Sequence, residues 1–138
     1  MKFDNIEEVI HYAIKENTTI SSVVLKHTAI LEEMTEEEIF ENMSINLMVM
    51  EESIKKGSQK DVKSLSGLTG GNSYKFKEYM KNSIVSGDFI GHVIMASLAV
   101  SEINACMGKV VASPTAGSCG ILPACLLTLE KHKNIPRE

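Results

Sequence analysis

The 138-residue sequence predicts an all-α fold, a helical domain with glycine-rich loops. Apolar residues recur every three or four positions along much of the chain, which is the period of a helix buried on one face. No stretch shows the apolar–polar alternation typical of a half-buried strand. Residues 1–56 contain neither glycine nor proline, whereas all nine glycines and all three prolines come from Gly57 onward. We therefore expect helices joined by polar turns first, and helices joined by special loops afterwards.

Two helices are expected near the start of the chain. A first set of apolar residues falls on one helical face, with Asp4 or Asn5 available as the N-cap. This set comprises Ile6, Val9, Ile10, Ala13 and Ile14. A second set predicts a helix over residues 20–31 and comprises Ile20, Val23, Val24, His27, Ile30 and Leu31.

A third helix is predicted over about residues 36–56. Thr35 and Glu38 have the spacing of a capping box, in which each residue bonds the backbone of the other. Apolar residues then step by three or four positions, at Ile39, Met43, Leu47, Met50 and Ile54. Two lysines suit the negative end of the helix dipole, and Gly57 suits the position just past the last turn.

Two further helices are expected after a polar break. A short one is predicted over residues 74–82 and a longer one over 88–107, which Asp88 can cap and Gly108 ends. The longer helix has an apolar face made of Phe89, Val93, Ala96, Val100 and Ile103.

The last third of the chain is expected to combine a linker, a loop and a helix. Residues 110–112 suit either a short strand or an extended linker, and the sequence leaves both open. Residues 114–120 are predicted to form a loop. Residues 121–132 are helical in composition, with Pro123 tolerated only in the first turn.

Composition argues against several classes of function. The apolar fraction of 43% and the charged fraction of 23% are those of a globular protein, which argues against disorder. The formal net charge of −4 and the absence of tryptophan argue against nucleic acid or a membrane surface as the main partner. An acidic N-terminus and short apolar runs give no sign of a signal peptide or spanning segment, so we expect a cytoplasmic protein. There the three cysteines would be reduced.

The first segment whose composition points to chemistry is the glycine-rich loop, residues 64–71. Glycines at positions 67, 70 and 71 let backbone N–H groups approach a ligand, and hydroxyl groups add donors. Such a loop before a helix can hold a carboxylate or a phosphate, although no Gly-Lys-Ser/Thr follows to make a Walker loop. The alternative is a flexible connector, and this segment alone favours it.

The second such segment is the cysteine-bearing loop, residues 113–120, which leads into an apolar helix. Thr115, Ser118 and the N–H groups of the helix start could form an anion site. Cys119 lies where the helix dipole favours the thiolate, the form that binds metal or acts as a nucleophile. The alternative is a tight turn with a buried cysteine, and the residues themselves balance the two interpretations.

The other cysteines and the histidines give weaker signals. Cysteine spacings of 13 and 6 match neither a zinc pair nor a ferredoxin pattern, so Cys106 and Cys125 are expected to be small core residues. The four histidines form no ligand-spaced pair, and a solvated or core-satisfied side chain is expected for each of them, including His92.

Three strings carry a resemblance to one family: SGLTGGN at 66–72, SEINACMGKVVASPTAGSCGILPACLL at 101–127, and INLMVMEESIKKG in the front half. They resemble the alpha chain of the bacterial iron–sulfur-dependent L-serine dehydratases, or L-serine ammonia-lyases. PTAGSCGILPA is long and chemically unusual, and the resemblance extends over essentially the whole chain. Residues 1–138 are accordingly expected to be the N-terminal part of that chain's catalytic domain.

The resemblance implies an all-helical catalytic domain with a [4Fe–4S] cluster, one iron of which lacks a protein thiolate and acts as a Lewis acid on the serine hydroxyl. A base removes the Cα proton, and the elimination product breaks down to pyruvate and ammonia without pyridoxal phosphate (PLP).

By position, Cys119 matches the first cluster cysteine, and no residue is assigned as the base. The loop expected to hold the substrate carboxylate comprises Ser66, Gly67, Thr69, Gly70 and Gly71, and candidate neighbouring contacts are Asn104, Thr115 and Ser118.

The family's other cluster cysteines lie downstream of this loop, and one cysteine cannot hold a [4Fe–4S] cluster alone. We therefore expect an N-terminal fragment, a truncated reading frame or a piece of a split subunit that is inactive alone. Its expected partners are L-serine, a beta chain and the missing C-terminal part of the alpha chain, with no nucleic acid and no membrane. The alternative function is a non-catalytic helical module that binds a small anion or a partner helix. Convergence of the two loops in space would favour the enzyme.

Overall fold

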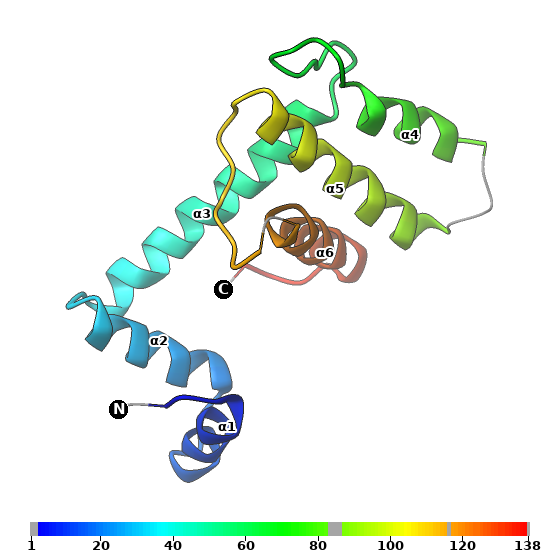
Figure 1. Ribbon diagram of the computed structural model, residues 1–138. Helices are drawn as coiled ribbons and strands as arrows, with labels where there is room; N and C mark the ends of the chain where they lie inside the picture. The colour runs from blue at the N-terminus through cyan, green and yellow to red at the C-terminus, as the bar shows by residue number, and fades with distance from the viewer. Residues whose placement is uncertain (1–2, 83–86, 116, 138) are drawn as a thin grey trace. The chain divides into compact units, whose positions relative to one another are not determined.

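The computed structural model describes residues 3–82, 87–115 and 117–137. Within these ranges every regular element is a helix, which confirms the predicted fold class (Figure 1). The helices are α1 (Ile6–Lys15), α2 (Ile20–Leu31), α3 (Glu36–Gly57), α4 (Asn72–Met80), α5 (Asp88–Ala105) and α6 (Ser118–Lys133). The chain divides into two compact units, Met1–Ile45 and Asn46–Glu138, and α3 runs from one into the other. Over the same ranges, none of these helices has the length and apolar character needed to cross a membrane.

In the first unit, α1 and α2 pack through a small apolar core. Val9 and Ala13 of α1 meet Val23 of α2, and all three are at least nine-tenths buried. Asn5 caps α1, as one of the two predicted alternatives requires, because its side-chain oxygen accepts a hydrogen bond of 2.9 Å from the backbone N–H of Glu8.

The start of α3 confirms the predicted capping box. The backbone N–H of Glu38 donates to the hydroxyl of Thr35 over 3.2 Å, and the backbone N–H of Thr35 donates to the Glu38 carboxylate over 2.8 Å. The backbone and side-chain hydrogen bonds from Thr35 hold the pKa of Glu38 below its usual value. The negative side chain also suits the positive end of the helix dipole.

Four helices are followed, one or two positions after their last residue, by a residue that is not glycine but has a positive φ. These residues are Asn17, Glu33, Met107 and Asn134. In each case the N–H of the next residue bonds a carbonyl oxygen five positions back, as in a Schellman motif. Gly108 was expected to end the long helix, but α5 ends at Ala105, and Met107 takes the left-handed conformation. Gly108 follows it because a Cβ there would lie 2.6 Å from the Ile103 side chain.

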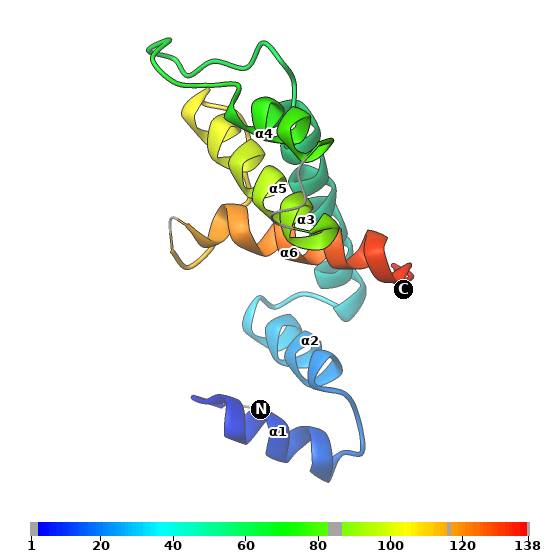
Figure 2. The same cartoon turned by 90° about the vertical axis from the view of Figure 1, so that its right-hand side faces the viewer.

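In the second unit α5 lies between α4 and α6 (Figures 1 and 2). Two glycines allow neighbouring helices to approach its backbone. A Cβ atom on Gly57, at the end of α3, would lie 2.0 Å from the carbonyl oxygen of Ala99. A Cβ atom on Gly120, in α6, would lie 3.2 Å from the carbonyl oxygen of Ser97. The prediction that Gly57 lies just past the helix end is wrong by one position, because Gly57 is the last residue of α3.

Two helices begin earlier than predicted. α4 begins at Asn72, where a buried side chain accepts the backbone N–H, and not at Tyr74. α6 begins at Ser118, so the loop expected over 114–120 is wrong in its last three residues. Pro123 is consequently the sixth residue of α6, in the second turn and not the first, and its ring is fully buried.

The remaining boundaries differ slightly from expectation. Asp88 is the first residue of α5, and Gly87 holds the cap position that was predicted for Asp88. The short helix α4 ends at Met80, two residues before the predicted end. Residues 110–112 run without helix or strand, so of the two alternatives the structure shows the linker.

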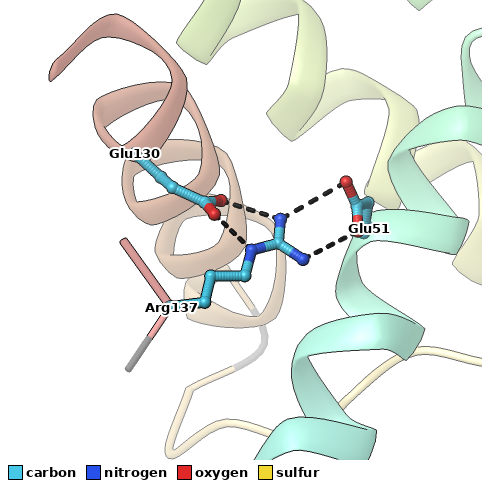
Figure 3. Close-up of polar contacts among 3 residues, drawn as sticks. All are labelled: Glu51, Glu130 and Arg137. Atoms are coloured by element: carbon cyan, nitrogen blue, oxygen red, sulfur yellow. Dashed lines mark hydrogen bonds and ion pairs between the residues drawn. The ribbon is translucent and has the colours of Figure 1, made fainter. Parts of the chain in front are cut away.

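The end of the described chain is held to two helices of the second unit by Arg137 (Figure 3). Its guanidinium donates from Nε and Nη2 to the two carboxylate oxygens of Glu130 in α6. The bond from Nη2 is 2.8 Å long. It also donates to both oxygens of Glu51 in α3, over 3.2 and 3.4 Å. These bonds raise the pKa of Arg137, and its side chain in turn lowers the pKa of Glu130.

Candidate functional site

The glycine-rich loop is closed by hydrogen bonds that converge on Ser64. The backbone N–H of Ser64 donates to the Thr69 carbonyl over 2.8 Å, and the Gly67 N–H donates to the Ser64 carbonyl over 2.8 Å. The Ser64 hydroxyl accepts from the Thr69 N–H over 3.2 Å and lies 3.1 Å from the Ser66 hydroxyl. Four amides of the loop, those of Ser64, Gly67, Leu68 and Thr69, therefore bond within the loop. The side chains of Ser66 and Thr69 are exposed.

The glycines of this loop have backbone conformations that other residues rarely adopt. Gly67 and Gly71 both have φ near +72°, and Gly70 has φ of +143°. A Cβ on Gly70 would lie 2.2 Å from the Val62 carbonyl oxygen, because the backbone at Gly70 passes close to the backbone of Val62 and Lys63. The glycines thus define the path of the chain, and the segment is an ordered loop with its own hydrogen bonds.

The last turn of α5 holds both ends of the glycine-rich loop. On the entering side, the Cys106 thiol donates to the Lys63 carbonyl over 2.7 Å, and the Leu65 N–H donates to the Ala105 carbonyl over 3.1 Å. On the leaving side, the Asn72 N–H donates to the carboxyl group of Glu102. Cys106, which is half-buried, is therefore a loop contact and not simply the small core residue that was expected.

Glu102 is the residue of this region that sequence reasoning missed. Its side chain is only 7% exposed, and within the described residues its Oε2 atom has no hydrogen-bond partner. The sequence holds a signal, because Glu102 follows Ala99, in the apolar run 98–100, by three residues and so shares its face of the helix. A carboxyl group on such a face is rare unless it has a specific polar partner.

In the cysteine-bearing loop, Thr115 and Ser118 bond each other. The Ser118 N–H donates to the Thr115 hydroxyl over 3.3 Å, the Thr115 N–H donates to the Ser118 hydroxyl over 3.1 Å, and that hydroxyl donates to the Thr115 carbonyl over 2.7 Å. Both hydroxyls thus shape the turn that starts α6. Cys119 follows as the second residue of the helix and is half-buried.

The two loops meet the same helix at different heights. Leu65 bonds Ala105 at the end of α5, whereas Gly120 lies against Ser97. Eight residues separate these points, which is about 12 Å along a helix. Figures 1 and 2 show the glycine-rich loop beyond the C-terminal end of α5 and the start of α6 farther down the same helix. Asn104, the remaining candidate, is exposed on the last turn of α5.

The described residues hold no group of three or more histidine, cysteine, aspartate or glutamate side chains placed to bind one metal ion. Cys106 is engaged with Lys63, and Cys125 is exposed in the middle of α6. Cys119 is the second residue of α6. The described part of this chain therefore does not offer the full ligand set of a cluster.

A hollow of about 390 Å³ lies elsewhere in the second unit, between α3, α5 and α6. His92 lines it, with its Nδ1 atom 3.2 Å from the Asp88 carboxylate and its side chain about half exposed, as the solvated alternative predicts. The other lining residues include Ile54, Phe89, Met95, Leu127, Lys131 and His132. None of the candidate site residues lies there.

The known proteins that match this chain all carry serine dehydratase names. The family model of the serine dehydratase alpha chain matches residues 15–138. A Bacillus subtilis (strain 168) protein named "Probable L-serine dehydratase, alpha chain" is 36% identical over 137 residues, which cover 99% of this chain and 45% of that protein. The "L-serine dehydratase, alpha chain" of Peptoniphilus asaccharolyticus is 32% identical over 94% of this chain and 45% of its own length.

A shorter match is the "L-serine dehydratase 2" of Escherichia coli (strain K12), which is 54% identical over 37 residues, 27% of this chain and 8% of that protein. No solved structure matches the chain significantly. The chain spans about 45% of the length of the two long relatives. The family match covers both loops and all the helices except most of α1. The chain therefore belongs to the serine dehydratase alpha chain family.

Proposed function

We propose that this chain forms part of an L-serine dehydratase, which converts L-serine to pyruvate and ammonia. The observation that carries the proposal is the family match over residues 15–138, since it includes the glycine-rich loop and the cysteine-bearing loop. The chain supplies the substrate-binding loop and one thiolate of a [4Fe–4S] cluster, and it acts in the cytoplasm without pyridoxal phosphate.

The glycine-rich loop is proposed to receive the carboxylate of L-serine. Ser66 and Thr69 expose hydroxyl donors, and Gly70 and Gly71 bring the backbone close to the start of α4, where the helix dipole favours an anion. Asn104 is proposed to line the same site, because it is exposed on the turn of α5 that holds the loop. Gly67 shapes the loop tip through its positive φ.

Cys119 is proposed to contribute one thiolate ligand at the start of α6, with Thr115 and Ser118 fixing the turn before it. When bound, the cluster supplies an iron that acts as a Lewis acid on the serine hydroxyl, a poor leaving group. The remaining ligands are proposed to come from polypeptide beyond the described residues. One proposed source is polypeptide equivalent to the remainder of the relatives, which are about twice as long as this chain. The other proposed source is a beta chain.

The test is anaerobic reconstitution of the 138-residue chain with iron and sulfide. Visible absorption reports the cluster, and pyruvate formation from L-serine reports turnover. We expect neither a stable cluster nor pyruvate from the isolated chain, since Cys119 alone cannot hold four irons. A stable cluster with serine turnover in the isolated chain would overturn the proposal that the site is completed from outside.

A further inference from the structure

The contacts of Glu102 are unusual for a residue that only stabilises the fold. One carboxyl oxygen accepts the N–H of Asn72, the first residue after the glycine-rich loop, across 30 positions of sequence. The other oxygen, Oε2, is buried and has no hydrogen-bond partner within the described residues. A buried carboxyl group with an unused oxygen costs stability, and apolar replacements of such groups are often neutral or stabilising.

The bond lies at a point where it determines the geometry of the loop. Asn72 follows Gly71, whose φ of +72° makes the backbone turn into α4. Gly71 is itself buried, whereas the loop tip from Leu65 to Thr69 is exposed. The Glu102 carboxyl group therefore fixes the exit of the loop, just as Cys106 and Ala105 fix its entry.

We propose that Glu102 is a positioning residue for the glycine-rich loop, and that its carboxyl group holds the loop in the conformation that receives a carboxylate-bearing amino acid. The second part rests on the proposed function, and the first part does not. Glu102 makes no contact with the ligand in this scheme. It acts through the Asn72 N–H and the start of α4.

The first measurement is hydrogen exchange of residues 61–72 in the full 138-residue chain without ligand. E102M is an apolar replacement of similar length. In this variant, hydrogen exchange should be about tenfold faster or more, because one hydrogen bond to a charged group is lost. The amides affected are those of Asn72 and of the loop-closing residues Ser64, Gly67 and Thr69. In E102Q exchange should be about threefold faster, because the amide oxygen still accepts but more weakly. E41M, which removes an exposed charge from α3, should match the wild type.

The thermal midpoint separates positioning from folding. E102M should unfold close to the wild-type temperature, because loss of the hydrogen bond from Asn72 is offset by removal of the unused buried oxygen. Faster loop exchange at unchanged stability is a result that a purely structural role would not give. Loop exchange equal to the wild type in a folded E102M chain would overturn the inference. Should E102M fail to fold, wild-type exchange in E102Q would overturn it equally.

The second measurement is the affinity of the same chains for L-serine, followed by NMR titration. We expect E102M to bind about tenfold more weakly, E102Q to be intermediate, and E41M to bind like the wild type. Tighter binding by E102M would overturn the inference, because it would mean that the carboxyl group competes with the ligand. Absence of L-serine binding by the wild type would count against the proposed function, while the exchange result would still decide the role of Glu102.

Discussion

Gly57 lies directly against the carbonyl group of Ala99, so that a Cβ atom on Gly57 would be only 2.0 Å from the oxygen. This contact sets the distance between the end of α3 and α5. Gly57→Ala should therefore destabilise the chain by about 2 kcal/mol, since overpacking outweighs the gain of about 1 kcal/mol in helix propensity. Urea unfolding followed by circular dichroism measures the difference.

Gly120→Ala is the matched control, because its Cβ would lie 3.2 Å from the Ser97 carbonyl oxygen and the neighbour needs to move only slightly. Its stability should change by less than about 1 kcal/mol in either direction. Equal effects of the two substitutions would mean that the approach of α3 to α5 is not what requires glycine.

The end of α2 offers a stabilising substitution. Glu33 has φ of +55°, a left-handed conformation that costs a residue with a Cβ roughly 1–2 kcal/mol. Glu33→Gly should raise the stability of the first unit by about 0.5–1 kcal/mol, net of the greater freedom of glycine in the unfolded chain. The neighbouring Glu32, with φ of −87°, has no such strain, so Glu32→Gly should lower stability by a similar amount. Thermal unfolding of both variants would decide, and a loss of stability in Glu33→Gly would contradict the assignment of strain.

The pair of Arg137 and Glu130 should make stability depend on acid pH. The hydrogen bond from Arg137 lowers the pKa of Glu130 in the folded chain. The pair therefore stabilises the fold above the unfolded pKa of about 4.3, and this contribution is lost as pH falls through the lower folded pKa. Arg137→Met should cause a small loss of stability at pH 7 that disappears once the pH has fallen below the lowered pKa of Glu130.

Lys133→Met provides the control for that series, because it removes a cation from the last turn of the same helix without touching the pair. Stability curves from pH 2 to pH 7 at low salt would show the effect. A difference between wild type and Arg137→Met that stays constant over this range would contradict the role given to Glu130.

Much of the fold could be predicted because apolar period and capping signals are local. The Thr35 capping box and the helix that follows it illustrate this, as does the cap at Asn5. The errors come from contacts that are distant in sequence. Gly57 was placed just past the end of α3 and is its last residue, and the sequence does not show that Ala99 lies against it. The early start of α4 likewise depends on a carboxyl group 30 residues away.

The candidate site could be predicted only as two segments. Composition picked out the glycine-rich loop and the cysteine-bearing loop, but it could not show that Ser64 closes the first or that Thr115 and Ser118 bond each other. Glu102 was overlooked because a charged residue in a long helix normally faces solvent. The arrangement of both loops along α5 follows from tertiary packing, which no local pattern encodes.

In the proposed function, this chain completes an L-serine dehydratase through Cys119. The most direct measurement is pyruvate formation from L-serine by the chain mixed anaerobically, with iron and sulfide, with the part of the Bacillus subtilis relative that it does not match and with a beta chain. Wild-type and C125S chains should support turnover, since Cys125 is exposed in the middle of α6. C119S should lower the rate about 100-fold or more, as expected for loss of a metal ligand. Equal pyruvate formation by the wild-type and C119S chains would contradict the proposed role of Cys119.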